Sequence, residues 1–475
     1  MCFIGLVSLL LLAACREPAP TPPAKPRLQP NILLIESDDQ RWDTLWATPR
    51  IRQLLEEDGV SFTQAVVTHP LCCPSRASLL SGGRYSHSLT ALGPDPRRCA
   101  ASTFDDRDTL AVRLQRHGYF TGLVGKYLND YDPIAPRVPP GWSVFVTRTG
   151  PPSYLEHRVV KGESTPDAAG VGRVRERSRY ITQLERDEAL AFLDQARAAG
   201  RPFFLWLTPH APHRPALPAP VDAASFADFD YRDRAWAEED LADKPDFVRR
   251  AAQAFIEGEG GLRRLPGQPG FPTGFPRAQV RTLQALDRAV GEVLDHLEQL
   301  RLDRPTVVLF TSDNGMLWGE HRLYKKGVAY EEAIRVPLLV RMPGVAAGTR
   351  EQLVAVDLDL AATILDLAGL PNGGDGVSLL PLLEGPAPRW REEVLLEGGP
   401  LRDVPRWVAL RSRSTKYVEY KDGQRELYDL GTDPFELESR HARPEEGTRM
   451  DRLSQQMATH REAAFAATAA PIDDL

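Results

Sequence analysis

The chain has 475 residues, of which 42% are hydrophobic and 26% charged, and its formal net charge is −7 at pH 7. This composition is typical of a folded protein with a large core. The length predicts two to three ordinary domains, or one large domain with a smaller partner. Lysine and arginine are dispersed, so no basic stripe indicates a nucleic-acid partner. Five cysteines without paired C-x-x-C spacing argue against a zinc site.

The N-terminus reads as a signal peptide of the lipoprotein type, residues 1–14. Its apolar run is too short to span a bilayer but suits a secretion signal. Leu-Ala-Ala before Cys15 resembles a bacterial lipobox, which implies cleavage there and lipidation of Cys15; an ordinary secretory signal is the alternative. No positive charge precedes the apolar run, although one is usual in a signal peptide, so the position of the start codon is left undecided. Residues 15–30 contain six prolines and predict an extended tether. We therefore expect an extracytoplasmic protein, in the periplasm or at the cell surface, that touches a bacterial membrane only through its lipid.

From residue 31 onward, buried strands alternate with amphipathic helices. This alternation predicts an α/β domain over residues 31–385, with a mostly parallel sheet covered on both faces. The predicted strands are Asn31–Ile35, Thr121–Val124, Phe203–Thr208 and Thr306–Thr311, and the predicted helices are Ile51–Asp58, Leu110–Arg116, Ile181–Ala199 and Arg277–Leu300.

Polar side chains follow several of these strands directly: Asp38, Asp39, His213, Asp313 and Asn314. In open α/β sheets, ligands bind outside the carboxyl ends of the strands. We therefore expect these side chains to gather at one edge of the sheet.

Two later regions have a different texture. Residues 214–280 are rich in proline, glycine and aromatic residues, and we expect them to form part of a substrate rim. Residues 386–475 predict a smaller antiparallel subdomain. Its expected strands are Trp407–Arg411, Lys416–Tyr420 and Glu426–Asp429, with a hairpin turn at Asp422-Gly423 and a helix from about Glu445.

The most informative stretch is Cys72-Cys73-Pro74-Ser75-Arg76, which continues to Gly82. It resembles the signature of the formylglycine-dependent sulfatases, C-x-P-S-R. That resemblance implies that a maturation enzyme oxidises Cys72 to formylglycine, and that one oxygen of the hydrated aldehyde is the nucleophile. Only Cys72 has proline two places later and arginine four places later. Proline suits the first position of a helix, so we expect a helix to start near Pro74.

The same resemblance extends over most of the chain, in order. Asp38-Asp39 and Asp313-Asn314 resemble the family's two pairs of metal ligands, which would bind the metal together with the modified Cys72. Carboxylate and amide oxygens form a hard site suited to Ca²⁺, with Mg²⁺ as the alternative. The family implies an alkaline-phosphatase-like fold, a mixed and mostly parallel sheet sandwiched by helices with a smaller C-terminal antiparallel subdomain.

Further matches suggest the catalytic cations. Arg76 follows the nucleophile by one helical turn, Lys126 lies in a Gly-Lys segment, and Lys326 has the spacing of the family's second lysine, with Lys325 as the alternative register. His213 resembles the histidine that contacts the leaving-group oxygen. His210 is the other candidate for that contact.

One position departs from many arylsulfatases. Where they carry a histidine two places after the Gly-Lys lysine, this chain has Leu128. The Gly-Lys segment with Leu128 resembles that of N-acetylglucosamine 6-O-sulfatases, so sulfated sugars are the expected substrates. The residue that acts as the base in expelling sulfate stays open. A phosphonate or phosphate ester hydrolase on the same scaffold, or a lipoprotein that binds sulfated glycans without turnover, are the alternatives.

Two further expectations concern the periphery of the site. His87, His210 and His321 are candidate substrate-binding residues. Cys73 and Cys99 could pair in an oxidising compartment, but a buried free Cys73 is the favoured outcome, because the sequence does not fix their distance.

Overall fold

The structure is a computed structural model that describes residues 29–86, 99–236, 238–253, 255–258, 261–264, 274–385, 389–401 and 403–465. The predicted signal peptide, Cys15, most of the tether and His87 therefore lie outside the described residues. Within the described ranges, no helix is both long and apolar enough to cross a membrane.

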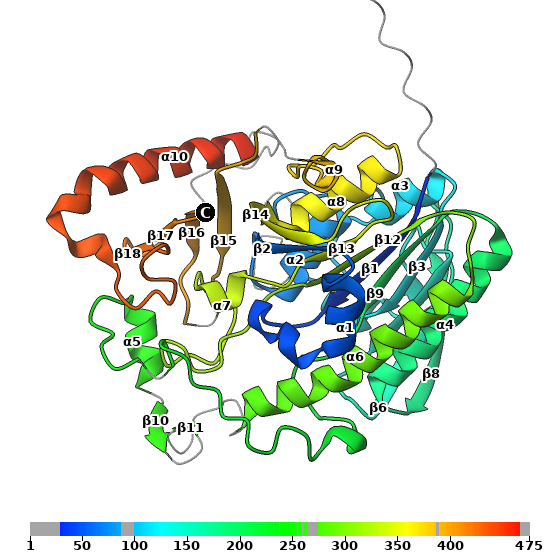
Figure 1. Cartoon of the computed structure of the whole chain (residues 1–475), viewed down its shortest axis with the longest axis horizontal. Helices are drawn as coiled ribbons and strands as arrows, with labels where there is room; N and C mark the ends of the chain where they lie inside the picture. The colour runs from blue at the N-terminus through cyan, green and yellow to red at the C-terminus, as the bar shows by residue number, and fades with distance from the viewer. Residues whose placement is uncertain are drawn as a thin grey trace, which may run out of the picture.

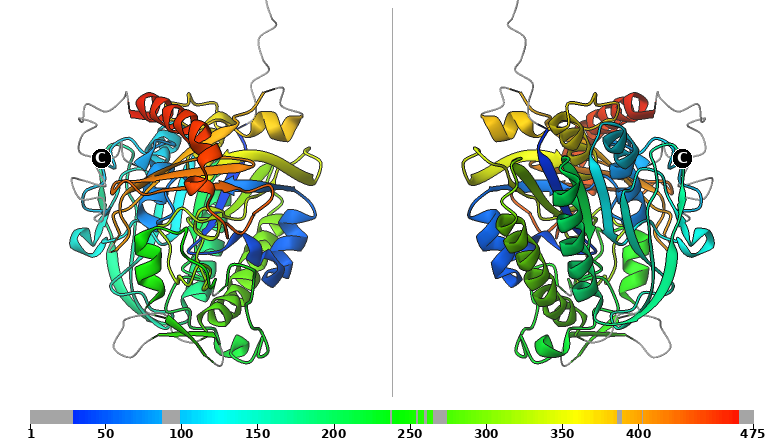
Figure 2. Two further views of the ribbon diagram at one scale, coloured as in Figure 1. Left: turned by 90° about the vertical axis from the view of Figure 1, so that its left-hand side faces the viewer. Right: turned by 90° about the vertical axis from the view of Figure 1, so that its right-hand side faces the viewer.

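A ten-stranded sheet forms the centre of the molecule, as Figures 1 and 2 show, in the order β14-β2-β13-β12-β1-β9-β3-β5-β6-β8. The run from β12 to β5 is parallel, while β13, β6 and β8 pair antiparallel to their neighbours. The predicted mixed, mostly parallel sheet is confirmed. Its strands are β1 (Asn31–Ser37), β2 (Val60–Val66), β3 (Phe120–Gly125), β5 (Val144–Thr149), β6 (Glu156–Gly162), β8 (Arg173–Ser178), β9 (Phe203–Thr208), β12 (Thr306–Ser312), β13 (Leu339–Arg341) and β14 (Gly348–Ala355).

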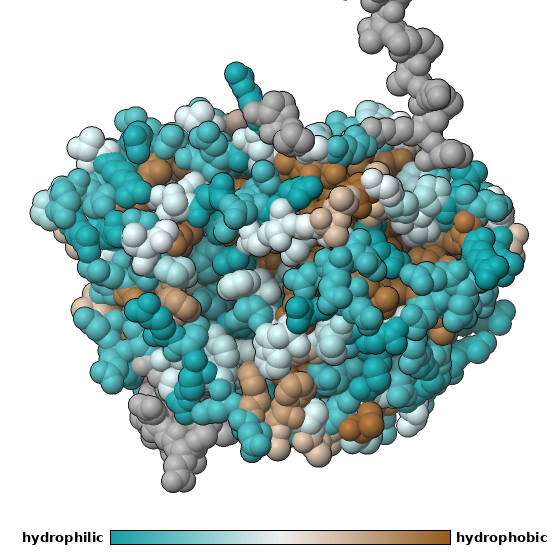
Figure 3. All heavy atoms as spheres, viewed as in Figure 1, coloured by the Kyte–Doolittle hydropathy of each residue, from teal (hydrophilic) through white to brown (hydrophobic). Residues whose placement is uncertain are grey.

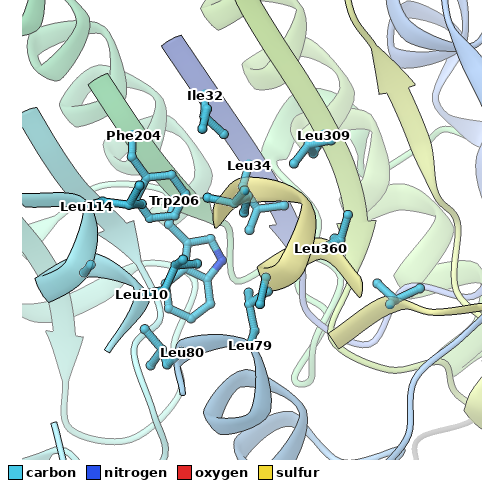
Figure 4. Close-up of a cluster of buried hydrophobic side chains, with 14 of the residues drawn as sticks. Ile32, Leu34, Leu79, Leu80, Leu110, Leu114, Phe204, Trp206, Leu309 and Leu360 are labelled. Carbon is cyan, nitrogen blue, oxygen red and sulfur yellow. The ribbon is translucent and has the colours of Figure 1, made fainter. Parts of the chain in front are cut away.

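Helices cover both faces of this sheet (Figure 1). One group is α1 (Pro49–Ile51), α4 (Ile181–Ala199) and α6 (Phe275–Gln299), and the other is α2 (Cys72–Leu80), α3 (Leu110–Arg116) and α8 (Val356–Leu367). Each buried strand serves both layers because its side chains alternate. In β1, Leu33 and Ile35 pack in the first layer, whereas Ile32 and Leu34 pack in the second, near Trp206 (Figure 4).

The predicted elements lie close to the observed ones. Helices α3 and α4 and strand β9 have the predicted bounds, and β1 runs two residues further, to Ser37. Helix α2 differs in its start, because Leu71 is its N-cap and Cys72 its first residue, so Pro74 is the third residue and not the first. The expected helix Ile51–Asp58 is a short α1 followed by a π-helical turn at Arg52–Glu56.

The C-terminal part contains a separate antiparallel sheet in the order β15-β16-β17-β18, drawn in orange in Figure 1. Its strands are β15 (Glu393–Gly398), β16 (Trp407–Ser412), β17 (Thr415–Tyr420) and β18 (Arg425–Asp429). Helix α10 (Gly447–Phe465) packs on one face through Met450, Leu453 and Met457. The other face contacts α5 (Asp246–Ala252) and α7 (Glu331–Ile334) of the first part. Strand β15 had no counterpart among the predicted strands.

The remaining elements are short: β4 (Arg137–Val138), β7 (Gly170–Val171), β10 (Phe255–Gly258), β11 (Gly261–Arg264) and α9 (Leu380–Glu384). Hydrophilic side chains cover most of the face shown in Figure 3. The boundary between residues 385 and 386 remains a prediction.

Candidate active site

Four neighbouring strands end at the same edge of the main sheet and carry most of the predicted site. β12, β1, β9 and β3 are adjacent in that order. Because Ser37 of β1 pairs with Ser312 of β12, Asp38 and Asp313 follow their strands side by side, and the Asp313 N–H donates to the Ser37 carbonyl at 3.1 Å. Parallel pairing thus brings together residues that are 275 positions apart in sequence.

Asp39 turns back toward this neighbour through an unusual backbone conformation. Its φ is +67°, in the left-handed region that few non-glycine residues adopt. In this conformation its N–H donates to Asp313 Oδ1 at 3.2 Å, and its Oδ1 accepts from Asn314 Nδ2 at 2.7 Å. The other amide atom, Asn314 Oδ1, is buried and has no hydrogen-bond partner among the residues that the structure describes. A ligand that accepts electron density from this oxygen would satisfy it.

Helix α2 places Cys72 at the centre of the cluster. Its Sγ lies 3.4 Å from Asp38 Oδ1, 3.9 Å from Asp39 Oδ1 and 2.6 Å from Lys326 Nζ. Burial raises the pKa of the Cys72 thiol above its ordinary value, and Asp313 and Asp38 raise it further. An unmodified thiol in this position is therefore protonated and a poor nucleophile.

The ligand atoms fit a divalent cation. Among the described residues, Asp38, Asp39, Cys72 and His213 each offer an atom, and these atoms lie within 4.8 Å of one another. Two ligands at about 2.4 Å from Ca²⁺ can be at most about 4.8 Å apart, so this spacing matches one coordination shell. The unpartnered Asn314 oxygen supports the same conclusion.

Two lysines contact the carboxylates. Lys126 follows β3, and its Nζ donates to Asp38 Oδ2 at 2.8 Å and lies 4.0 Å from Asp313 Oδ2. Lys326 Nζ contacts Asp39 Oδ1, whereas Lys325 pairs with Asp403 at 3.1 Å, so Lys326 is the lysine that faces the cluster. Burial would lower the pKa of both ammonium groups, but the carboxylates raise it and keep them charged.

The Arg76 side chain hydrogen-bonds to residues that form the site and is not directed at a ligand position. Its side chain is fully buried; Nε donates to Asp313 Oδ2 at 2.8 Å and Nη1 to the Lys126 carbonyl at 3.1 Å. The same group lies 3.5 Å from Glu36, which sequence reasoning did not single out. Burial raises the pKa of Glu36 to about 8 although Arg76 lowers it, so burial favours the neutral form of this carboxyl. Arg76 is therefore a positioning residue in this structure.

The two histidines after β9 lie together, with ring centroids 5.1 Å apart. His213 Nε2 lies 3.7 Å from Asp39 Oδ2, and its Nδ1 donates to the Arg214 carbonyl at 2.6 Å. His210 is completely buried, with Nδ1 3.8 Å from Asp38 Oδ2, and neither ring nitrogen makes a hydrogen bond within the described part of the chain. Burial lowers the pKa of His213 to about 4 and that of His210 to about 3.

Three expectations need correction or a narrower reading. His321 does not line a rim: it is fully buried, stacks on Tyr330 and hydrogen-bonds Glu238 at 2.7 Å. Cys73 is not free but forms a disulfide with Cys99, with Cα atoms 5.7 Å apart. The sequence missed this pair because 25 residues separate the two cysteines. Leu128 packs in the hydrophobic core and brings no base to the cluster.

Two supporting residues escaped sequence reasoning. Gln279 of α6 donates to the Asp39 carbonyl at 3.5 Å and to the Pro212 carbonyl at 3.1 Å. Tyr154 donates its hydroxyl to the His213 carbonyl at 2.8 Å and packs against the His210 ring. Neither lies in a motif, and neither a polar residue on an amphipathic helix, such as Gln279, nor a tyrosine between two strands, such as Tyr154, carries a local signal of such a role.

Comparison with known proteins identifies the family. A family model described as Sulfatase matches residues 30–370, and one described as N-sulphoglucosamine sulphohydrolase, C-terminal, matches residues 319–463. The chain belongs to the sulfatase family. It is 30% identical over 389 residues to the human N-acetylglucosamine-6-sulfatase, covering 78% of this chain and 67% of that protein. It is 29% identical over 412 residues to the extracellular sulfatase SULF-1 homolog of Drosophila melanogaster, covering 83% of this chain. It spans 35% of the length of that protein and 55% of its Caenorhabditis elegans counterpart.

Solved structures confirm the fold. One, determined in complex with its substrate D-glucosamine-2-N,6-O-disulfate, superposes with a TM-score of 0.77 at 23% identity, covering 93% of this chain and 99% of that one. A phosphonate monoester hydrolase from Silicibacter pomeroyi superposes with a TM-score of 0.70 at 24% identity, covering 93% and 96%. The two neighbours carry different activities, so the fold alone does not decide between them.

Proposed function

We propose that this protein hydrolyses sulfate esters of sulfated carbohydrates, through a formylglycine made from Cys72 and a bound Ca²⁺. The observation that carries the proposal is the position of Cys72, on the first residue of α2, within 4 Å of Asp38, Asp39 and Lys326. A cysteine with a raised thiol pKa has little use as a thiolate there. Conversion to formylglycine supplies an oxygen nucleophile at the same place.

The metal would be held by Asp38, Asp39, Asp313 and Asn314, with residue 72 beside it. A divalent ion there polarises the nucleophile and compensates the charge of an anionic ester. Without it, the three aspartates balance Lys126, Lys326 and Arg76, so the site has no surplus positive charge for an anion. The expected ion is Ca²⁺ because it tolerates irregular and higher coordination by oxygen ligands better than Mg²⁺ does.

The lysines would hold the sulfate group. Lys126 approaches the cluster from the end of β3 and Lys326 from the loop between β12 and α7; the first is buried and the second partly buried, and the carboxylates keep both ammonium groups charged. Such fixed donors stabilise charge on sulfate oxygens at low cost of reorganisation. Arg76 keeps Asp313 and the Lys126 backbone in place for this task.

His213 would serve the leaving group. Since its Nδ1–H is committed to the Arg214 carbonyl, Nε2 is the atom that can hold the transferable proton. An anionic ester next to Nε2 favours the imidazolium form, which can then protonate the departing alkoxide. His210, buried behind it, would hold the ring of its neighbour.

The substrate we propose is a 6-sulfated N-acetylglucosamine. The supporting observations are Leu128 in the Gly-Lys segment and the resemblance of the Cys72 segment to that enzyme class; the related human protein is named accordingly. Residues 214–280 would contribute contacts to the sugar.

The test has two parts. Mass spectrometry of the tryptic peptide containing residue 72 should find formylglycine in protein from a host with a maturation enzyme. Activity on N-acetylglucosamine 6-sulfate should then exceed activity on an aryl sulfate and on a phosphonate monoester. Faster turnover of the phosphonate would favour the alternative hydrolase, and an unconverted Cys72 in the native host would favour a binding protein.

We also propose that the protein is lipid-anchored through Cys15 outside the cytoplasm, as the lipobox resemblance and the extracellular relatives suggest. Substitution Cys15→Ser should move it from the membrane fraction to the soluble fraction. Membrane association that survives this change would contradict the anchor.

A further inference from the structure

A second group of carboxylates lies apart from the proposed ligands of the active-site metal. Asp233 comes from the segment before α5, Glu320 from the loop after β12, and Glu332 from α7. One oxygen of each lies within 4.8 Å of the others, the spacing that one coordination shell of Ca²⁺ allows. Glu320 is fully buried, and Glu332 is 5% exposed.

Glu332 is the unusual member of this group. Its Oε2 is buried and makes no hydrogen bond to any described residue. Glu320, in contrast, accepts from Arg41 Nη1 at 2.6 Å and from the Trp318 N–H, and Asp233 accepts from Tyr231 and Trp236. A buried carboxylate oxygen without a donor is costly, so it indicates a missing partner.

The nearby protein cation does not supply that partner. Arg41 donates to Asp43, Glu320, Tyr231 and the Met316 carbonyl. Its hydrogen bonds to the described residues therefore engage Glu320 alone among the three clustered carboxylates. Because Arg41 also serves Asp43, it does not satisfy the clustered carboxylates of Asp233 and Glu332.

We propose that Asp233, Glu320 and Glu332 bind a second divalent cation, for which Ca²⁺ is the best match. Three carboxylates from three segments provide the hard oxygen ligands that Ca²⁺ prefers, and water completes such a shell. The site is built independently of the active-site cluster and does not depend on the proposed reaction.

The position of the site suggests what the ion does. The residue next to Glu320 already joins the two segments, since the His321 N–H donates to the Ala235 carbonyl at 3.0 Å and Trp236 bridges to Glu320. A cation here fastens residues 231–236 to the loop that leads to Lys326. The ion is therefore a structural clamp beside the active site.

Calcium stoichiometry of the full chain tests the proposal. Purified protein is stripped with a chelator, re-equilibrated with CaCl₂, and its bound metal is measured. We expect two Ca²⁺ per chain in the wild type, one in Glu332→Gln, and one in Asp39→Asn, which removes the active-site ion. Terbium luminescence excited through tryptophan should fall in Glu332→Gln, because Tyr231 and Trp318 lie against Arg41 beside this pocket.

A wild-type protein with one Ca²⁺, lost in Asp39→Asn and kept in Glu332→Gln, would overturn the proposal. So would two ions that both persist in Glu332→Gln. Because Glu332 is buried, Asp233→Asn provides a second variant at a half-exposed position. Asp233→Asn should lower the affinity of the second site for Ca²⁺ by about tenfold or more and leave the affinity of the active site unchanged. Wild-type affinity at both sites in this variant would also contradict the proposal.

Discussion

Two regions of the molecule bury many charges, and they satisfy them differently. Around the C-terminal sheet, Glu426 accepts hydroxyl hydrogens from Tyr330, Tyr420 and Tyr428 at 2.8, 2.6 and 2.5 Å. In the same region Glu331 pairs with Arg411 at 2.8 Å. At the edge of the main sheet, several buried polar atoms have no hydrogen-bond partner among the described residues, whereas near the C-terminal sheet Arg411 keeps one such atom, Nη1, beside its ion pair.

The unpartnered atoms at the edge of the main sheet include Asn314 Oδ1, which would coordinate the proposed ion, both ring nitrogens of His210 behind His213, and Nη2 of the positioning residue Arg76. Buried charge alone is therefore a weak sign of function, because a well-paired network mainly joins two parts of a fold. Buried groups that the protein leaves incomplete are the stronger sign. The same criterion distinguishes Glu332 from its neighbour Glu331.

The largest expected effect is at the nucleophile. Cys72→Ala should lower kcat/KM by roughly 10³-fold or more, because no other side chain replaces a lost nucleophile. The unfolding temperature should change little, since alanine fits the first turn of α2. Activity on N-acetylglucosamine 6-sulfate and thermal unfolding, measured on the same preparation, check this. Near-normal turnover would refute the role of residue 72.

The next effect concerns the metal ligands. Asp39→Asn should lower kcat by about 100-fold or more, since even outer partners of metal sites commonly cost 10–100-fold. Chelator treatment of the wild type should give a similar loss that Ca²⁺ reverses. Activity that is insensitive to both changes would show that the cluster binds no catalytic ion.

The matched change in the other region should affect stability instead. Glu331→Gln leaves Arg411 buried without its carboxylate, whereas Lys416 keeps Glu436, and breaking a buried pair costs about 3–5 kcal/mol. We expect a lower midpoint of chemical unfolding but a nearly normal kcat for the folded fraction. A selective loss of kcat without destabilisation would erase the contrast between the two regions.

The secondary-structure elements that could be predicted from the sequence are those marked by a local pattern of residues. The bounds of α3, α4 and β9 were predictable because hydrophobic periodicity and a final glycine or turn mark them. Strands β6 and β8 were missed because they lie at the sheet edge, where exposed arginines and glutamates dilute the pattern. Strand β15 has too little alternation to stand out.

The site shows the same division. Asp38, Cys72 and Lys126 were predictable because a short motif or a strand end marks each one. Gln279 and Glu36 were not, since their roles depend on which backbone or guanidinium lies opposite in three dimensions. The disulfide of Cys73 was missed for the same reason: a distance across the fold is invisible in the spacing.

A smaller effect is the pH dependence of stability near the start of the Cys72 segment. Asp357 accepts from the N–H and hydroxyl of Thr68 at 2.9 and 2.6 Å, and burial raises its pKa from 3.8 to about 7. A raised carboxyl pKa means that the unfolded chain releases this proton first as pH rises. Neutral Asp357 therefore contributes to the free energy of unfolding below pH 3.8, and this contribution is lost as the pH rises to about 7. It amounts to about 4 kcal/mol at most.

Asp357→Asn should remove that contribution. Urea unfolding from pH 4 to pH 8 should show a shallower decline for the variant, with the difference in unfolding free energy growing toward pH 7. Parallel curves for the two proteins would show that Asp357 is ionised in the fold.

The smallest effect links the two regions. Trp407 of β16 donates its indole N–H to the Gly327 carbonyl at 3.0 Å, next to Lys326, and the Gly327 N–H donates to the Pro70 carbonyl at 2.9 Å. Trp407→Phe removes the first bond, which should cost about 1 kcal/mol and let the Lys326 loop move. We expect kcat to fall a few-fold with KM nearly unchanged.

Trp390→Phe is the control, because it loses a comparable indole hydrogen bond, to the Leu353 carbonyl at 2.7 Å, far from the Lys326 loop in sequence. Equal effects of the two variants on kcat would mean that the C-terminal sheet stabilises the fold without positioning Lys326.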